Sequence, residues 1–124
     1  MIYKLMVVAF GGSVGAVARY LVFLLVGRYY EGVFPWASLF VNLAGAFAIG
    51  FLWGLFDRLY VSPAIRTFLL IGILGSFTTF STLTFDVLSL YRDGEIKMML
   101  MYLLSSNILG IALVFSGFYL FKLI

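Results

Sequence analysis

The chain has 124 residues, of which 65% are hydrophobic and 10% charged, with a mean hydropathy of +1.17 and a net charge of +3. Such a small number of polar side chains cannot cover the surface of a soluble domain. The composition therefore indicates a membrane protein along the whole chain. The sequence contains no cysteine and no histidine, which excludes disulfides, thiol nucleophiles and the usual zinc sites. Most of the five carboxylates fall in predicted loops, so we expect no acid–base pair inside the membrane and no enzyme.

Four apolar stretches, each about as long as the roughly 20 residues that span a bilayer, follow one another along the chain. The predicted helices are Ile2–Gly27, Pro35–Phe56, Pro63–Tyr91 and Ile96–Lys122. The first stretch is too long for a signal peptide and lacks a cleavage site, so we expect it to stay in the mature protein. Short connections predict one all-α membrane domain over residues 1–124, a single four-helix subunit in the cell membrane.

The third stretch is interrupted at its centre by glycine and hydroxyl residues, in the run GILGSFTTFSTLT from Gly72 to Thr84. Irregular backbone at membrane depth persists only where protein or a water-filled path surrounds it. The sequence therefore predicts a broken third helix near Gly75–Thr79, and an ion path or a partner beside it.

Small residues recur at a spacing of four on three of the predicted helices. This spacing lets two helix backbones approach closely, so we expect these residues to lie at helix contacts. They are Gly11/Gly15 and Gly12/Ala16 on the first helix, Ala46/Gly50/Gly54 on the second, and Ser106/Gly110 on the fourth.

The basic residues divide almost evenly between the two predicted membrane faces. The face with both termini has four, which are Lys4, Arg58, Arg66 and Lys122, and the other has three, which are Arg28, Arg92 and Lys97. The charge bias that normally fixes topology is therefore nearly absent. The chain can then insert in either orientation, and two oppositely inserted copies can form an antiparallel two-fold dimer. A dimer is expected because four helices alone are too few to enclose an aqueous path. A single, loosely determined topology is the alternative. With no basic run, nucleic-acid binding is not expected.

Three polar features within the spans are candidates for function. Asn42 needs a partner, because an unpaired amide in hydrocarbon costs roughly 2–7 kcal/mol; the partner is either another helix or an anion. Tyr102 and Ser106 lie one turn apart and predict a hydroxyl track along the fourth helix. Arg19 and Asp86 approach the same membrane face, so an ion pair, a shared vestibule or separate snorkelling to the interface is possible.

Four motifs, one per predicted helix, resemble the Fluc/CrcB family of microbial fluoride channels. They are GGSVGAVARY at residues 11–20, VNLAGAFAIG at 41–50, GSFTTFST at 75–82, and Tyr102-x-x-x-Ser106-x-x-x-Gly110. The resemblance covers nearly the whole chain. It implies a fluoride-specific channel that exports fluoride passively, as a dual-topology homodimer with two antiparallel pores.

The resemblance also implies site residues and a structural sodium ion at the dimer centre. The implied pore and fluoride-contacting positions are Ser38, Asn42, Thr79, Phe80, Ser81, Tyr102 and Ser106, and the implied vestibule positions are Arg19 and Asp86. The implied sodium ligands are the backbone carbonyls of Gly75 and Thr78, contributed twice by the two-fold axis. Neutral donors and a phenyl ring edge suit an anion, and oxygen ligands suit a hard cation.

Leu83 departs from the family pattern, because a second pore phenylalanine is expected there. Leucine offers no ring edge to an anion, so each pore should lose one of two rings. A homodimer with one ring per pore, a heterodimer whose homologous partner supplies the ring, and a reduced rate all remain open. A small multidrug transporter, with a similar length and helix number, needs a carboxylate in its first helix, where this chain has Arg19 and no acidic residue.

Overall fold

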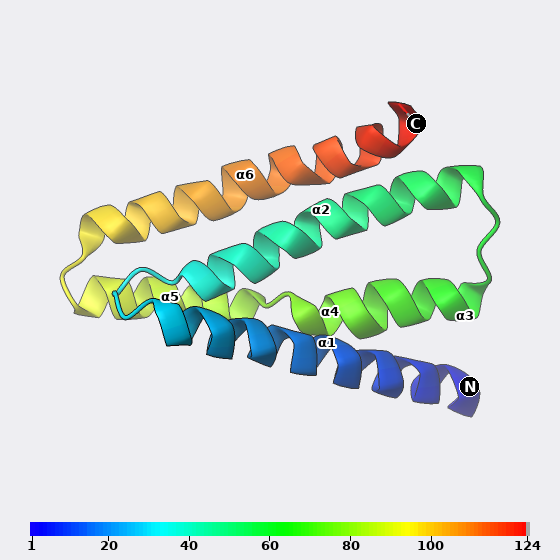
Figure 1. The fold of residues 1–124 in the computed structure, drawn as a ribbon, viewed down its shortest axis with the longest axis horizontal. Helices are drawn as coiled ribbons and strands as arrows, with labels where there is room; N and C mark the ends of the chain where they lie inside the picture. Colours follow the sequence, from blue (N-terminus) through cyan, green and yellow to red (C-terminus); the bar gives the residue numbers. More distant parts are fainter. Residues whose placement is uncertain (124) are drawn as a thin grey trace.

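The chain folds into four long helical spans, seen in a computed structural model that describes residues 1–123 (Figure 1). Each span is long and apolar enough to cross a membrane. The elements are α1 (Ile2–Tyr29), α2 (Trp36–Arg58), α3 (Pro63–Arg66), η1 (Thr67–Leu74), α4 (Gly75–Phe77), α5 (Phe80–Arg92) and α6 (Ile96–Leu123). The elements from α3 to α5 form the third span, so the predicted all-α fold with a broken third helix is confirmed. Ile124, the last residue of the predicted domain, lies outside the described residues.

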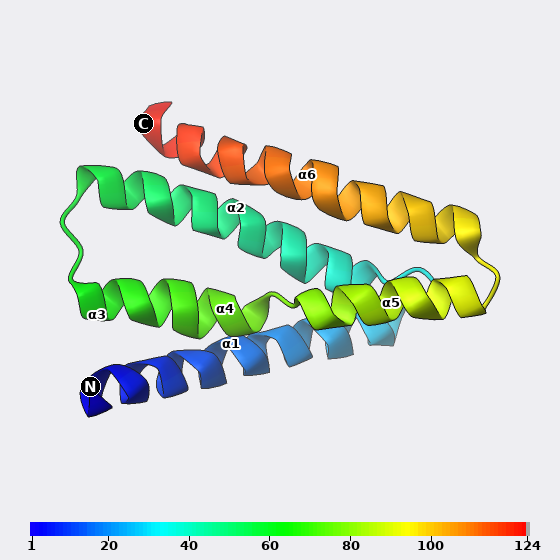
Figure 2. The same ribbon diagram turned by 180° about the vertical axis from the view of Figure 1, so that it is seen from behind.

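The spans pair out of chain order. α1 packs along the first half of the third span, and α2 packs along α6, so that α2 and the third span lie in the middle of the molecule (Figures 1 and 2). Both termini and the connection between α2 and α3 lie at one end, and the other two connections lie at the opposite end. This arrangement agrees with the two predicted faces of the basic residues.

Local signals explain where the elements begin and end. Ser62 caps α3 by accepting a hydrogen bond from the Ile65 N–H, and Pro63 occupies the first helical position, where its missing N–H is not needed. Gly94 turns the chain between α5 and α6 with φ +77°, a conformation that glycine adopts without strain. The observed helices extend a few residues beyond their predicted ends at Gly27 and Phe56.

Most of the first half of the third span is a π-helix, η1, which the sequence did not predict. Its widened turns face α1 at a glycine contact, where the Cα atoms of Gly11 and Gly72 meet with no side chain between them. A π-helix has no composition signal of its own, since it forms from residues that equally suit an α-helix.

Glycines at the predicted spacing do lie at helix contacts. An added Cβ on Gly15 would collide with the Ile73 carbonyl, and one on Gly50 would collide with the Val114 carbonyl. Gly110 is the exception, because nothing lies within 4 Å of the position its Cβ would take. The expected close packing at Ser106/Gly110 is therefore not found within one chain.

Candidate functional site

The third span breaks at two threonines in extended conformation. Thr78 has φ −85° and ψ 157°, and Thr79 has φ −153° and ψ 118°, between the end of α4 and the start of α5. Their hydroxyls satisfy the helix ends on either side. Thr78 Oγ1 donates to the Leu74 carbonyl at 2.9 Å, and Thr79 Oγ1 accepts from the Thr82 N–H at 3.2 Å as the N-cap of α5. The predicted position of the break is confirmed.

Asn42 on α2 joins the break with both ends of its amide. The Thr79 N–H donates to Asn42 Oδ1 at 2.9 Å, and Asn42 Nδ2 donates to the Thr79 carbonyl at 3.2 Å. The expectation that Asn42 has a partner is confirmed, and the partner is the extended backbone at the break in the third span. One N–H of its amide nitrogen remains for a further acceptor.

A hollow of about 270 Å³ opens beside this contact. Its lining comes from α2, the break, α5 and α6, and consists of Asn42, Thr78, Thr79, Phe80, Leu83, Ser106 and Asn107. Five of the predicted pore positions, among them Asn42, Thr79 and Phe80, therefore meet at one place. The predicted position Ser81 is exposed and lies outside this lining, with its hydroxyl 3.3 Å from that of Thr79.

The side chains around this hollow differ in their hydrogen bonding and in their exposure. The hydroxyl oxygen of Ser106 is buried and has no hydrogen-bond partner within residues 1–123. Phe80 is 76% exposed, so its ring projects away from its own chain. Leu83 is partly buried against the cluster of Leu39, Leu90 and Tyr102. The hollow thus offers an unpaired hydroxyl and one free ring.

Tyr102 and Ser38 lie away from the hollow, in the core between α2, α5 and α6. Tyr102 is 0% and Ser38 is 2% exposed, and Ser38 lies against the Tyr102 hydroxyl. That hydroxyl donates to Asp86 Oδ2 at 3.0 Å. The single hydroxyl proton of Tyr102 is therefore already donated to Asp86. The predicted hydroxyl track along the fourth helix is buried at this residue.

Arg19 and Asp86 are not joined in the structure. Asp86 turns toward α6 and Tyr102, whereas Arg19 lies in a shallow hollow with Ala16, Tyr20 and Phe23 of its own helix. Among the described residues no ion pair links them, so the shared vestibule is not formed within one chain. The physical reason is that the carboxylate finds a buried hydroxyl donor on its own side of the bundle.

A second hollow, of about 320 Å³, lies on the other side of Asn42. Its lining includes Gly45, Leu74, Gly75 and Thr78, and Asn42 and Thr78 line both hollows. The usual i+4 donor to the Gly75 carbonyl is the Thr79 N–H, which Asn42 occupies instead. Within residues 1–123 no hydrogen bond reaches the Gly75 or Thr78 carbonyl. Both predicted cation ligands are therefore free acceptors beside one hollow.

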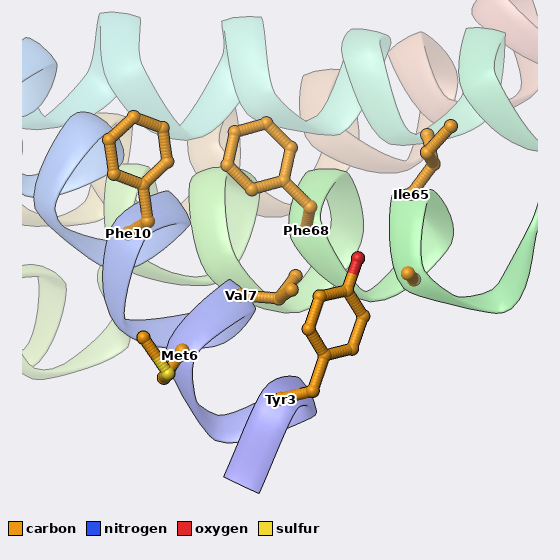
Figure 3. Close-up of a pocket in the computed structure, with 7 residues that line it drawn as sticks. Tyr3, Met6, Val7, Phe10, Ile65 and Phe68 are labelled. Carbon is orange, nitrogen blue, oxygen red and sulfur yellow. The ribbon is translucent and has the colours of Figure 1, made fainter.

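A further hollow, of about 340 Å³, lies between the N-terminal end of α1 and the start of the third span, and has a different character (Figure 3). Phe10 stacks on Phe68 there at 5.8 Å, and the remaining lining is Tyr3, Met6, Val7, Ala64 and Ile65. Apart from the Tyr3 hydroxyl, no side chain in this lining can hydrogen-bond an ion.

Two residues of the site were missed from the sequence. Asn107 lines the first hollow and donates to the Leu103 carbonyl at 2.8 Å. Its signal was an amide within an apolar span, next to Ser106. Gly45 lies against the Thr78 methyl group, where any side chain would collide. Its signal was weaker, because the small-residue spacing on α2 indicates packing without naming the neighbour.

Comparison with known proteins identifies the family of the chain. Residues 6–118 match the family described as CrcB-like protein, Camphor Resistance (CrcB). The chain belongs to this family. Among curated CrcB relatives, a protein of Aquifex aeolicus named fluoride-specific ion channel FluC is 45% identical over 91% of this chain and 92% of its own length. Proteins of the same name from Chlorobium phaeobacteroides, 46% identical over 96% and 93%, and Rhodospirillum centenum, 40% identical over 95% and 94%, are also similar.

Membership of the CrcB family, together with the four membrane-spanning helices, makes the chain a multi-pass membrane protein that is not an enzyme. The family resemblance seen in the four motifs is thereby confirmed. Of the residues in these motifs, Asn42, Thr78, Thr79, Phe80 and Ser106 line the hollow at the break, whereas Tyr102 and Arg19 lie elsewhere.

Proposed function

We propose that this chain is the subunit of a channel that exports fluoride passively across the cell membrane. The observation that carries the proposal is the hollow at the helix break, where Asn42, Ser106 and the start of α5 meet. The curated relatives named fluoride-specific ion channel FluC support fluoride as the ion.

The donors at this hollow are neutral, which suits a path through which an anion must move. The Ser106 hydroxyl and the remaining N–H of Asn42 can each donate to an anion. The N-terminal end of α5 adds a partial positive charge, as in transporters with broken helices. These groups replace part of the hydration shell of a small, strong acceptor without holding it as tightly as a fixed cation would.

A second copy in antiparallel orientation would complete the path. Phe80 is 76% exposed and Gly75 is exposed as well, so the break faces outward from a single chain. The balanced basic residues permit both insertions, and a two-fold axis would bring two breaks together and give two pores, with lipid around the dimer. The positive edge of the Phe80 ring can then meet the anion.

A sodium ion is the proposed structural cofactor of this dimer. The free carbonyls of Gly75 and Thr78 are hard neutral oxygen donors, the kind that such a cation prefers. Two chains would supply four of them. When bound, the ion would neutralise acceptors that the break leaves without donors.

A small multidrug transporter is the less supported function, because α1 carries no carboxylate for proton exchange. Leu83 leaves a heterodimeric fluoride channel as a narrower variant of the main proposal. In that variant a homologous partner supplies the missing ring.

The test is anion efflux from liposomes reconstituted with the purified protein. Release of fluoride with retention of chloride is expected, and equal release of both ions would refute the proposal. Ser106→Ala should slow fluoride release, whereas Ser105→Ala should not, because Ser105 does not line the hollow. If the wild-type chain is silent alone but conducts when co-expressed with a homologue, the heterodimer is the correct assembly.

A further inference from the structure

The two hydrogen bonds between Asn42 and Thr79 fix the peptide units on both sides of Thr79. In the extended conformation of Thr79, its own N–H and C=O point toward the same edge of the chain. Asn42 occupies that edge, with its oxygen on the N–H and its nitrogen on the C=O. The amide can be placed only in this way, because an N–H requires an acceptor and a carbonyl requires a donor.

The neighbouring backbone groups must then point the opposite way. A trans peptide unit directs its C=O and its N–H to opposite sides, and the described chain contains no cis peptide bond. The Thr78 carbonyl shares a peptide unit with the Thr79 N–H, and the Phe80 N–H shares one with the Thr79 carbonyl. Neither group forms a hydrogen bond within residues 1–123. By fixing the Thr79 backbone on one edge, Asn42 therefore fixes the direction of the Thr78 carbonyl, a free acceptor, and of the Phe80 N–H, a free donor, on the opposite edge.

We infer that Asn42 is a positioning residue that couples the anion path to the cation site through the Thr78–Thr79 peptide. Asn42 and Thr78 line both hollows, so the connection is one side chain and one peptide long. The inference rests on the proposed function for the identity of the two ions. The pair of hydrogen bonds between Asn42 and Thr79, here called the clamp, does not depend on either ion.

The coupling has a defined direction. An anion that accepts the remaining N–H of Asn42 increases the electron density on Asn42 Oδ1, which then accepts more strongly from the Thr79 N–H. The same polarisation passes to the Thr78 carbonyl and makes it a better ligand for a cation, as in other hydrogen-bonded chains. Loss of the Asn42 amide should therefore weaken cation binding although Asn42 is not itself a proposed ligand.

Hydrogen–deuterium exchange of the full-length protein in detergent tests the clamp without using flux. In Asn42→Ala, the Thr79 amide within peptides covering residues 74–84 should exchange about tenfold faster than in wild type. Asn107→Ala is the matched control, because it removes an amide from the same hollow that bonds only within α6. Unchanged exchange in Asn42→Ala, or equal acceleration in both variants, would overturn the inference.

Two further measurements keep the test decisive. If Asn42→Ala does not fold, Asn42→Leu replaces it, since leucine has a similar size and can neither accept from the Thr79 N–H nor donate to its carbonyl. Protection equal to wild type would then overturn the clamp. Thermal unfolding in sodium chloride against an equal concentration of N-methylglucamine chloride tests the coupling. The sodium concentration that stabilises the Asn42 variant should rise about tenfold, with Asn107→Ala unaffected. A full sodium response in the Asn42 variant contradicts the coupling, whereas no response in wild type contradicts the proposed cation site and leaves the clamp to the exchange result.

Discussion

Gly11 and Gly12 are adjacent on α1, yet an alanine at each should have opposite effects on stability. A Cβ on Gly11 would lie 2.8 Å from the Phe68 carbonyl oxygen and 3.0 Å from the Gly72 Cα. The first distance is 0.6 Å short of the 3.4 Å at which ordinary contact begins, and both obstacles are backbone atoms of η1 that cannot rotate away. A Cβ on Gly12 would meet only the Ser76 hydroxyl, at an ordinary 3.9 Å.

The magnitude follows from two opposing effects. Alanine in place of glycine favours a helix by about 1 kcal/mol at either position. Overpacking at Gly11 costs about 1–3 kcal/mol, and the rigid neighbours favour the upper part of that range. Gly11→Ala should therefore lower the free energy of unfolding by up to about 2 kcal/mol, while Gly12→Ala should raise it by up to about 1 kcal/mol.

Titration of the purified variants with a denaturing detergent in mixed micelles, with the unfolded fraction measured at each step, gives this difference. The helix propensity cancels between the two variants, so their difference in free energy reports the contact between α1 and η1 alone. If Gly11→Ala is as stable as Gly12→Ala, the close approach of α1 to the π-helix is not present in the folded protein.

Three further predictions concern the pore and the topology. Leu83→Phe should raise fluoride flux by supplying a second ring beside Phe80. Because Leu83 also packs on Leu39 and Tyr102, the larger ring should lower stability by roughly 1–3 kcal/mol through overpacking. The integrity of the proposed dimer is therefore checked together with the flux. Phe80→Leu should silence the channel, and full flux in an intact Phe80→Leu dimer would exclude ring-edge contact as the conduction mechanism. Single cysteines at Arg28 and Lys97 should each react with an impermeant reagent from both sides of the membrane, with comparable yields. Labelling from one side only would contradict the antiparallel dimer.

The large features of this fold were predictable because each has a strong local cause. Long charge-free runs specify the four spans, and the threonines at residues 78 and 79 specify the break because their hydroxyls cap the adjoining helix ends. The convergence of Asn42, Phe80 and Ser106 was indicated by the family motifs. Physical chemistry alone marked Asn42 and Ser106 as polar residues within apolar spans, without placing them together, and it did not mark Phe80.

The remaining features depend on tertiary contacts that no local pattern encodes. The sequence left the partner of Asn42 open between another helix and an anion, and only the fold shows that most of its amide is used by the Thr79 backbone. Asp86 and Arg19 share an expected membrane face, but the choice of Tyr102 as the partner of Asp86 depends on how α5 turns against α6. The π-helix and the role of Asn107 likewise depend on neighbours distant in the sequence.

The pairing of α1 with the third span and of α2 with α6 has a consequence for biosynthesis. The first span emerges from the ribosome well before its main neighbour, and the second must wait for the last span of the chain. α1 can bury its glycine face only after the third span has entered the bilayer, and α2 can bury its own only after the fourth span has followed. Nascent chains stalled before that point leave small-residue faces without partners in the lipid. The pairing of the spans is therefore completed late, and a chain cut short in its last span would leave the glycine face of α2 uncovered.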